Sequence, residues 1–227
     1  MSGFACESPM ALGPAIRTLL GVRLARRVGR CYRGIFVDLA KEAAALSAVL
    51  PPNAHLLDVG GGDGEPLNNL LAQRPDLRIT TLDPKPKVGD WIEARFAPRV
   101  TRLAGTSLAD YLAADRPDPD VLLIADVLHH IPVTERTGFL GPVRALLERA
   151  PHLCIIVKDV EPGSWRAILG SLSDRYITGD PDVSLIAREN LARLLEEHLG
   201  PLRREDTKLF ETDPPNYAIA FFRATCP

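Results

Sequence analysis

The sequence predicts an α/β fold in which helices cover both faces of a mostly parallel β-sheet. Between residues 53 and 160, short apolar runs alternate with segments of helical periodicity. Strands that alternate with helices form right-handed βαβ units, and such units build doubly wound domains. Near the C-terminal end, two apolar runs follow one another without a helix between them. This order indicates an antiparallel hairpin at one edge of the sheet.

The apolar runs define the expected strands. Five of them are short continuous runs, as expected for parallel strands that are covered on both faces. These five strands are predicted over residues 55–59, 78–82, 100–103, 121–125 and 153–157. The two strands of the hairpin are predicted over residues 207–211 and 217–223, with a turn over 212–216. The complete sheet would then have seven strands.

Helices are expected where apolar residues recur every three or four positions. The first of them would cover residues 32–50 and end at Pro51 and Pro52, because proline cannot continue a helix. Two others are expected over residues 134–149 and 187–199. We interpret residues 1–50 as a helical lid and residues 51–227 as a Rossmann-like cofactor-binding and catalytic domain.

The N-terminal region carries an excess of positive charge. Residues 11–33 contain no acidic residue and six arginines, namely Arg17, Arg23, Arg26, Arg27, Arg30 and Arg33. Such a cluster is typical of a solvated helix face. The alternative is a contact with an anionic substrate or partner.

Composition excludes several classes of protein. The 227 residues carry a formal net charge of −2, which gives no general attraction to nucleic acid or anionic membranes. The sequence has no apolar run of 18 residues, so no transmembrane helix is expected, and no signal peptide is recognisable. Its four cysteines are scattered and form neither a disulfide framework nor a metal site. We therefore expect a cytoplasmic protein without a bound metal. The sequence leaves open whether the chain forms a homodimer.

A glycine-rich turn follows the first predicted strand. It reads Asp58-Val59-Gly60-Gly61-Gly62-Asp63-Gly64, and a helix is expected to start directly after it. Glycine lets the backbone approach a ligand closely, and the helix N-terminus adds free N–H groups. The dinucleotide pattern GxGxxG would need a third glycine at position 65, where the chain has Glu65. This spacing disfavours NAD and FAD.

Charge favours a cationic ligand at the same turn. Asp58 would repel a pyrophosphate but attract an ammonium or sulfonium group. Asp83 ends the next strand, 19 residues after Gly64. An acid at about this distance is placed to accept hydrogen bonds from ribose hydroxyls. The two acids together indicate an adenosine cofactor with a positive charge.

Three motifs resemble those of the class I S-adenosylmethionine-dependent methyltransferases. Leu57-Asp58-Val59-Gly60-Gly61-Gly62-Asp63-Gly64 is similar to the family's first motif, and Leu82-Asp83-Pro84 to its second. The run from Asp120 to Ile131 resembles the fourth strand and the turn after it. The resemblance implies the strand order 3-2-1-4-5-7-6, with strand 7 antiparallel, and S-adenosylmethionine as the cofactor, which leaves as S-adenosylhomocysteine.

The resemblance also suggests where the cofactor binds. One departure concerns the third strand, after which the family often has an acid that contacts the adenine amino group. This chain has Gly105-Thr106-Ser107-Leu108 there, and a hydroxyl could accept the same hydrogen bond more weakly. The predicted cofactor-binding residues are Asp58, Gly60, Gly61, Gly62, Asp83, Pro84, Thr106, Ser107 and Asp126.

Catalytic groups are expected after strands four and five, because ligands bind outside the carboxyl ends of parallel strands. His129 or His130 could act as a general base, and the alternative is that they only form a turn. Asp126 could likewise fix the turn only, and Lys158-Asp159 could hold the loop through an ion pair.

The main interpretation is methyl transfer to oxygen, nitrogen or carbon of a small molecule. One alternative acceptor is RNA or protein, although the motifs of amine and cytosine-C5 methylation of nucleic acid are missing after strand four. Alternatives of another class are a catalytically silent scaffold that binds S-adenosylmethionine and an NAD(P)-dependent oxidoreductase.

Overall fold

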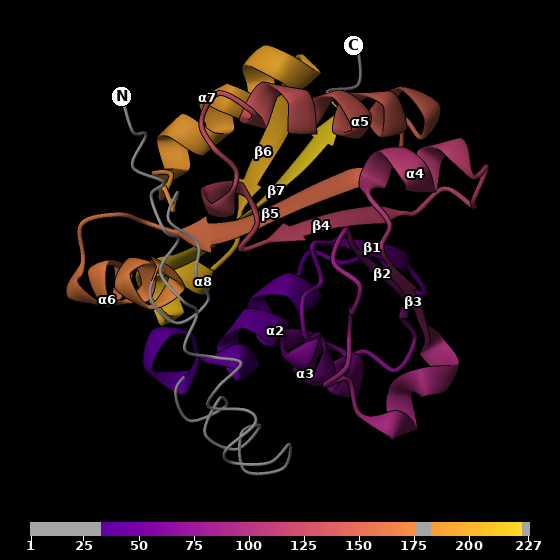
Figure 1. Ribbon diagram of the computed structural model, residues 1–227, viewed down its shortest axis with the longest axis horizontal. Helices are drawn as coiled ribbons and strands as arrows, with labels where there is room; N and C mark the ends of the chain where they lie inside the picture. The colour runs from indigo at the N-terminus through magenta and orange to yellow at the C-terminus, as the bar shows by residue number, and fades with distance from the viewer. Residues whose placement is uncertain (1–32, 176–182, 224–227) are drawn as a thin grey trace, which may run out of the picture.

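The computed structural model describes residues 33–175 and 183–223 and contains one seven-stranded sheet (Figure 1). The strand order is β3-β2-β1-β4-β5-β7-β6, with β7 antiparallel to both β5 and β6 and the other pairs parallel. The predicted fold class and strand order are therefore confirmed. The strands are β1 (His55–Val59), β2 (Arg78–Asp83), β3 (Val100–Ala104), β4 (Val121–Ala125), β5 (Cys154–Val160), β6 (Leu202–Asp206) and β7 (Asn216–Arg223).

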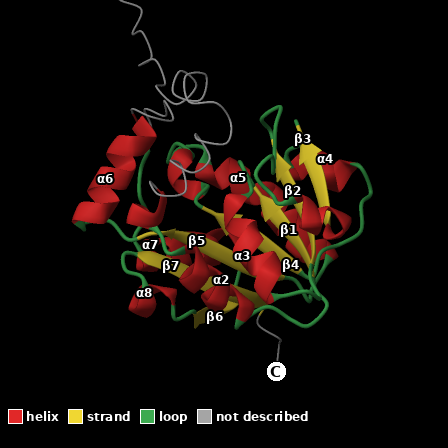
Figure 2. Ribbon diagram, turned by 90° about the horizontal axis from the view of Figure 1, so that it is seen from below, coloured by secondary structure: helices red, strands yellow, loops and turns green. Residues whose placement is uncertain are grey.

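Helices form a layer on each face of the sheet (Figures 1 and 2). The α-helices are α2 (Leu39–Ser47), α3 (Glu65–Gln73), α4 (Leu108–Ala113), α5 (Arg136–Arg149), α6 (Trp165–Ser173), α7 (Arg188–Leu199) and α8 (Leu209–Thr212). Short 3₁₀ helices cover Ala94–Arg99 and Leu128–His130. Among the helices described, none is long and apolar enough to cross a bilayer.

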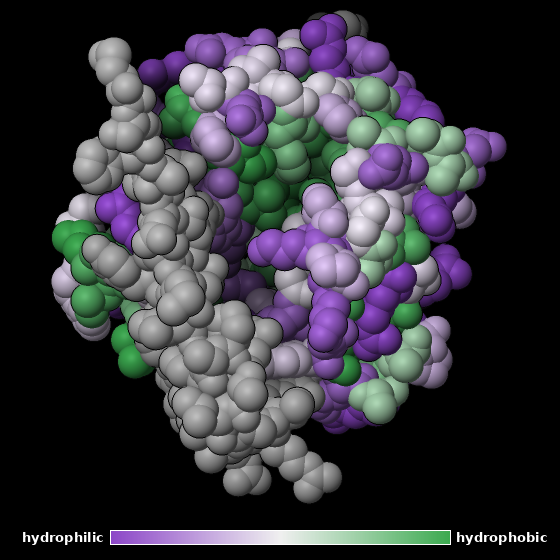
Figure 3. Space-filling view, in the orientation of Figure 1, coloured by the Kyte–Doolittle hydropathy of each residue, from purple (hydrophilic) through white to green (hydrophobic). Residues whose placement is uncertain are grey.

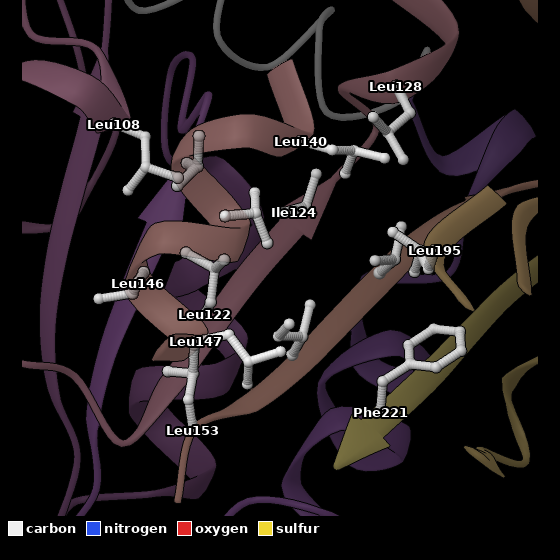
Figure 4. Close-up of a cluster of buried hydrophobic side chains, with 14 of the residues drawn as sticks. Leu108, Leu122, Ile124, Leu128, Leu140, Leu146, Leu147, Leu153, Leu195 and Phe221 are labelled. Atoms are coloured by element: carbon white, nitrogen blue, oxygen red, sulfur yellow. The ribbon is translucent and has the colours of Figure 1, made fainter. Parts of the chain in front are cut away.

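The core has two halves because successive strand residues point to opposite faces. Leu57 and Val59 of β1 pack with α4, α5 and α7, whereas Leu56 packs with α2, α3 and α8. Figure 4 shows the first half, in which Leu140 and Leu146 of α5 lie close to the strands. Burial on both faces explains why these strands are apolar throughout.

The N-terminal helix differs from the prediction. A single helix was expected over residues 32–50, but the structure breaks it at Val37 and Asp38. Asp38 is extended, and its carboxylate accepts hydrogen bonds from the backbone N–H groups of Ala40 and Lys41. This N-cap starts a new helix, α2.

Part of residues 39–50, the end of the predicted lid, packs against the core. Ala43 and Leu46 on the apolar side of α2, and Leu50 after it, are buried with residues of α3 and the sheet. Residues 1–32, which hold the rest of the predicted lid and five of its six arginines, lie outside the described residues. The sixth, Arg33, forms an ion pair with Asp63 at 2.7 Å.

The C-terminal hairpin is confirmed, but the position of its first strand was wrong. The edge strand is β6 (Leu202–Asp206), and residues 209–211, expected to be extended, lie in α8. An edge strand has a neighbour on one side only, so its charged sequence can remain in contact with solvent. The apolar Leu209 led to the strand prediction. Its side chain is indeed buried, but the residue belongs to a helix rather than to a strand.

Candidate active site

The predicted site residues lie at the carboxyl ends of β1, β2, β3, β4 and β5. These ends meet at one edge of the sheet. The face in Figure 3 is hollowed near its middle, over the region of β4 and β5 in Figure 1. This is the position at which open α/β sheets bind their ligands.

The glycine-rich turn has the backbone shape that the sequence predicted. Gly60 and Gly62 have positive φ angles of 75° and 51°, which a residue with a side chain rarely adopts. The backbone N–H groups of Gly60 and Gly61 both donate to the Leu82 carbonyl, at 2.9 and 3.1 Å. The turn then leads into α3, whose N-terminus opens beside it. Backbone N–H groups and a helix N-terminus thus border one concave turn.

Gly61 leaves no space for a side chain. A Cβ atom there would overlap the Thr81 hydroxyl and the Asp58 carboxylate. We expect Gly61→Ala to lower the free energy of unfolding by about 1–3 kcal/mol through overpacking. It should also displace the turn and weaken cofactor binding, because the Thr81–Asp58 hydrogen bond must break. Urea denaturation and titration calorimetry measure both effects.

Gly138→Ala is the matched control, because its Cβ meets no atom within 4 Å. Gly138 lies on α5, where alanine should be neutral or stabilising. Equal stability and cofactor affinity in the two variants would show that the turn tolerates a side chain.

Asp58 lies beneath the turn rather than on its surface. Its side chain is buried, and Oδ2 accepts a 2.7 Å hydrogen bond from the Thr81 hydroxyl. Burial raises the pKa of Asp58 to about 6, the Thr81 hydrogen bond lowers it, and the negative charges of Asp83 and Glu42 raise it further. The carboxyl is therefore mostly ionised at neutral pH and loses its charge in mild acid.

Asp83 shapes the same turn from the neighbouring strand. Its Oδ2 accepts a hydrogen bond from Gly62 N at 3.1 Å, and its Oδ1 accepts one from Lys85 N at 2.8 Å. Each carboxylate oxygen has a second lone pair, so ribose hydroxyls can still donate to it. Pro84 follows and is exposed.

Thr106 and Ser107 differ in what their hydroxyls do. The Thr106 hydroxyl donates to the Ala104 carbonyl, and its backbone N–H donates to the Asp83 carbonyl at 3.0 Å. Ser107 caps α4 and shares a reciprocal pair of hydrogen bonds with Asp110. Ser107 therefore has a structural task, and Thr106 is the better placed of the two for a ligand beside Asp83.

Asp126 is held in place by a buried lysine. It has a positive φ of 54°, and both of its carboxylate oxygens accept hydrogen bonds from Lys158 Nζ, at 2.8 and 2.6 Å. Glu42 of α2 lies 3.7 Å from the same Nζ. Lys158 is 2% exposed and Glu42 is also buried, whereas the Asp126 side chain is 42% exposed, so this triad reaches the surface only at Asp126. The ion pair expected at this loop exists, with Asp126 and Glu42 as the partners of Lys158.

His129 and Asp159 form a buried pair beside this triad. His129 Nδ1 donates to Asp159 Oδ1 at 2.6 Å, and both side chains are at most 5% exposed. Burial alone would lower the pKa of His129, but the hydrogen bond to Asp159 and the charges of Asp159, Asp126 and Asp174 raise it above the usual 6.5. A proton fixed on Nδ1 leaves the lone pair on Nε2, as a general base requires.

His130 is less suited to this task. It is half-buried and stacks obliquely on His129, with ring centroids 4.2 Å apart. The sequence named the two histidines as equal candidates, and His129 is the one that is buried and paired with Asp159. The role of Asp159 as that partner was not recognised from the sequence, although its position after a buried strand was a signal.

Comparison with known proteins agrees with the fold. No known family model matches the chain. Ribosomal RNA small subunit methyltransferase G of Desulfotalea psychrophila is 29% identical over 114 residues, which are 49% of this chain and 50% of that protein. The chain thus spans about half the length of this relative.

Several solved methyltransferases share the architecture. Human N-acetylserotonin methyltransferase, solved with S-adenosylmethionine, matches with a TM-score of 0.62 and 20% identity over 83% of this chain and 52% of its own. Mitomycin 7-O-methyltransferase matches with a TM-score of 0.60 and 23% identity over 82% of this chain and 54% of its own. N,N-8-amino-8-demethyl-D-riboflavin dimethyltransferase from Streptomyces davawensis matches with a TM-score of 0.59 and 18% identity over 91% of this chain and 61% of its own. The chain therefore has the seven-stranded fold of these methyltransferases.

Proposed function

We propose that the chain transfers the methyl group of S-adenosylmethionine to a hydroxyl group of a small molecule. The observation that carries the proposal is the His129–Asp159 pair, which lies next to a glycine-rich turn suited to an adenosine cofactor. The solved relatives named above include enzymes of small-molecule methylation. A hydroxyl must lose its proton as it attacks, and this need explains a base held by a carboxylate.

The residues of the turn fit the cofactor. Gly61 lets the turn lie directly on Thr81 and Asp58, Asp83 has lone pairs for ribose hydroxyls, and Asp58 supplies negative charge beneath the turn. When bound, S-adenosylmethionine supplies an electrophilic methyl group on a sulfonium. A cation of this kind is favoured by the acids around the turn.

His129 would take the proton of the acceptor on Nε2. The imidazolium formed is stabilised by Asp159, whose carboxylate already accepts the Nδ1 proton. The chain's main remaining task is to hold acceptor and cofactor in line.

The direct test uses labelled S-adenosylmethionine and an extract of host metabolites. The proposal expects a labelled small molecule whose label is on oxygen, identified by mass. Label found only in macromolecules would exclude the small-molecule acceptor. Binding of the cofactor without any transfer would favour a silent scaffold.

Asp58→Asn should change how the affinity for the cofactor depends on pH, because it removes the titrating carboxyl beneath the turn. The wild-type carboxyl ionises as pH rises through about 6, so affinity for the cationic cofactor should rise from pH 5 to pH 7. Over this range the α-amino group of the cofactor stays mostly protonated, since such groups titrate at about 7.8. The asparagine variant should lack this rise and bind more weakly at pH 7 by about 1–3 kcal/mol.

Titration calorimetry at pH 5, 6 and 7 makes this comparison. The two proteins should converge at pH 5, where wild-type Asp58 is neutral. If the cofactor affinities of the two proteins changed in parallel with pH over the whole range, the charge of Asp58 would not contribute to cofactor binding.

Ribosomal RNA is a second candidate acceptor. It is supported by the relative from Desulfotalea psychrophila, whose name states this substrate, and by the arginines of residues 11–33. The net charge of −2 speaks against it. Adding ribosomal RNA to the labelling assay distinguishes the two. We also propose a cytoplasmic location, consistent with Cys154, a free and buried thiol.

A further inference from the structure

Arg136, the first residue of α5, has a buried guanidinium group that the proposed reaction does not use. Only 7% of the residue is exposed. Its Nε donates to the carbonyls of Leu128 and Ile131, both at 3.1 Å, and its Nη2 donates to the Ser184 carbonyl at 2.6 Å. One side chain thus joins three backbone carbonyls from two segments that are about 50 residues apart.

These contacts surround the short helix that carries His129. Leu128 begins this helix and Ile131 follows it, so Arg136 fastens both of its ends. The backbone N–H of Ser184 donates in turn to the His129 carbonyl at 2.8 Å. Because the backbone is fixed on both sides, the imidazole ring keeps one direction.

Arg136 also places a positive charge near Asp159. The attraction of Asp159 opposes the effect of burial, which lowers the pKa of Arg136. This charge matters because Asp159 Oδ2 is buried and accepts no hydrogen bond from the residues that the structure describes. The charged and titratable groups that face the His129–Asp159 pair are Asp126 after β4, His130, Arg136 on α5, Lys158 on β5, Asp174 after α6 and Tyr217 on β7.

We infer that Arg136 is a positioning residue for His129. It fastens the backbone of the helix that carries the base, and its positive charge lies near Asp159, the carboxylate opposite the imidazole. The assignment rests on the proposed function in so far as His129 is the base of that reaction. The contacts themselves do not depend on it.

The test compares Arg136→Met and Arg136→Lys with the wild-type chain. Titration of ¹³C-labelled histidine by NMR follows His129, whose signal is identified with a His129→Asn variant. Arg136→Met removes the positive charge near the His129–Asp159 pair. The pair should therefore bind its proton more readily and titrate at a higher pH than in the wild type. Lysine keeps the charge, so Arg136→Lys should titrate as the wild type does.

Methyl transfer into the metabolite extract provides the second readout. At pH 7.5 we expect Arg136→Met to lower the rate about 10–100-fold, as expected for a misplaced catalytic group. Arg136→Lys should recover part of this loss, and calorimetry should give both variants nearly wild-type affinity for S-adenosylmethionine. Arg144→Met is the matched control, because Arg144 lies exposed on the same helix. If the methionine variant does not fold, Arg136→Gln replaces it, since glutamine keeps donors without the charge.

Wild-type titration of His129 in a folded Arg136→Met or Arg136→Gln variant would overturn the inference, even if the rate fell. Absence of methyl transfer by the wild-type chain would count against the proposed function alone. The histidine titration would then still decide whether Arg136 controls His129.

Discussion

Replacing His129 by asparagine is expected to lower the rate of methyl transfer by about 10²–10⁴-fold, the usual contribution of a general base. Asparagine removes the basic Nε2 but can still donate a hydrogen bond to Asp159. Affinity for S-adenosylmethionine should stay within about twofold, because His129 lies on the acceptor side of the proposed reaction. Single-turnover rates and calorimetry separate the two effects.

The pH profile sharpens this prediction. Protonation of Nε2 removes the lone pair, so the wild-type rate should fall as pH drops through the pKa of His129, which lies above 6.5. The acidic limb should vanish in His129→Asn. His130→Asn is the matched control and should lose less than about tenfold, because His130 is not the residue paired with Asp159. Equal losses in the two variants would contradict the assignment of the base.

Lys158→Met should cause the largest loss of stability. Methionine fills much of the same space but leaves Glu42 and Asp126 without their cation. Removing one member of a buried ion pair costs about 3–5 kcal/mol, and we expect about 2–4 here because the Asp126 side chain is 42% exposed. Urea denaturation followed by circular dichroism measures the loss.

A second substitution tests the electrostatic cause. Burial raises the pKa of Glu42, so without Lys158 this carboxyl must either stay buried as a charge or take up a proton. Adding Glu42→Gln to Lys158→Met removes this cost, so the double variant should be more stable than Lys158→Met alone. Lys208→Met, at an exposed lysine, is the control and should change stability little. A double variant less stable than Lys158→Met would show that packing, and not charge, causes the loss.

The strands of the sheet interior could be predicted because burial on both faces requires continuous apolar runs. β1 and β4 begin and end where the sequence placed them. β6 could not be found in this way, since its sequence Leu-Arg-Arg-Glu-Asp is satisfied by one neighbouring strand and by solvent. The error at residues 207–211 follows from the same cause.

The binding turn was recognisable because its chemistry is contiguous in sequence. The pairing of His129 with Asp159 was not, because the two residues are 30 positions apart. Lys158 and Asp159 are adjacent, yet successive strand residues point to opposite faces, so each meets a different partner. Arg136 was hidden for a further reason, since its contacts are backbone carbonyls, which leave no trace in a sequence.

Titration calorimetry of the full chain with S-adenosylmethionine, S-adenosylhomocysteine and NAD tests the central claim most directly. The acids around the turn and the glycine spacing predict binding of the first two and no binding of NAD. Binding of NAD with no heat from S-adenosylmethionine would contradict the account.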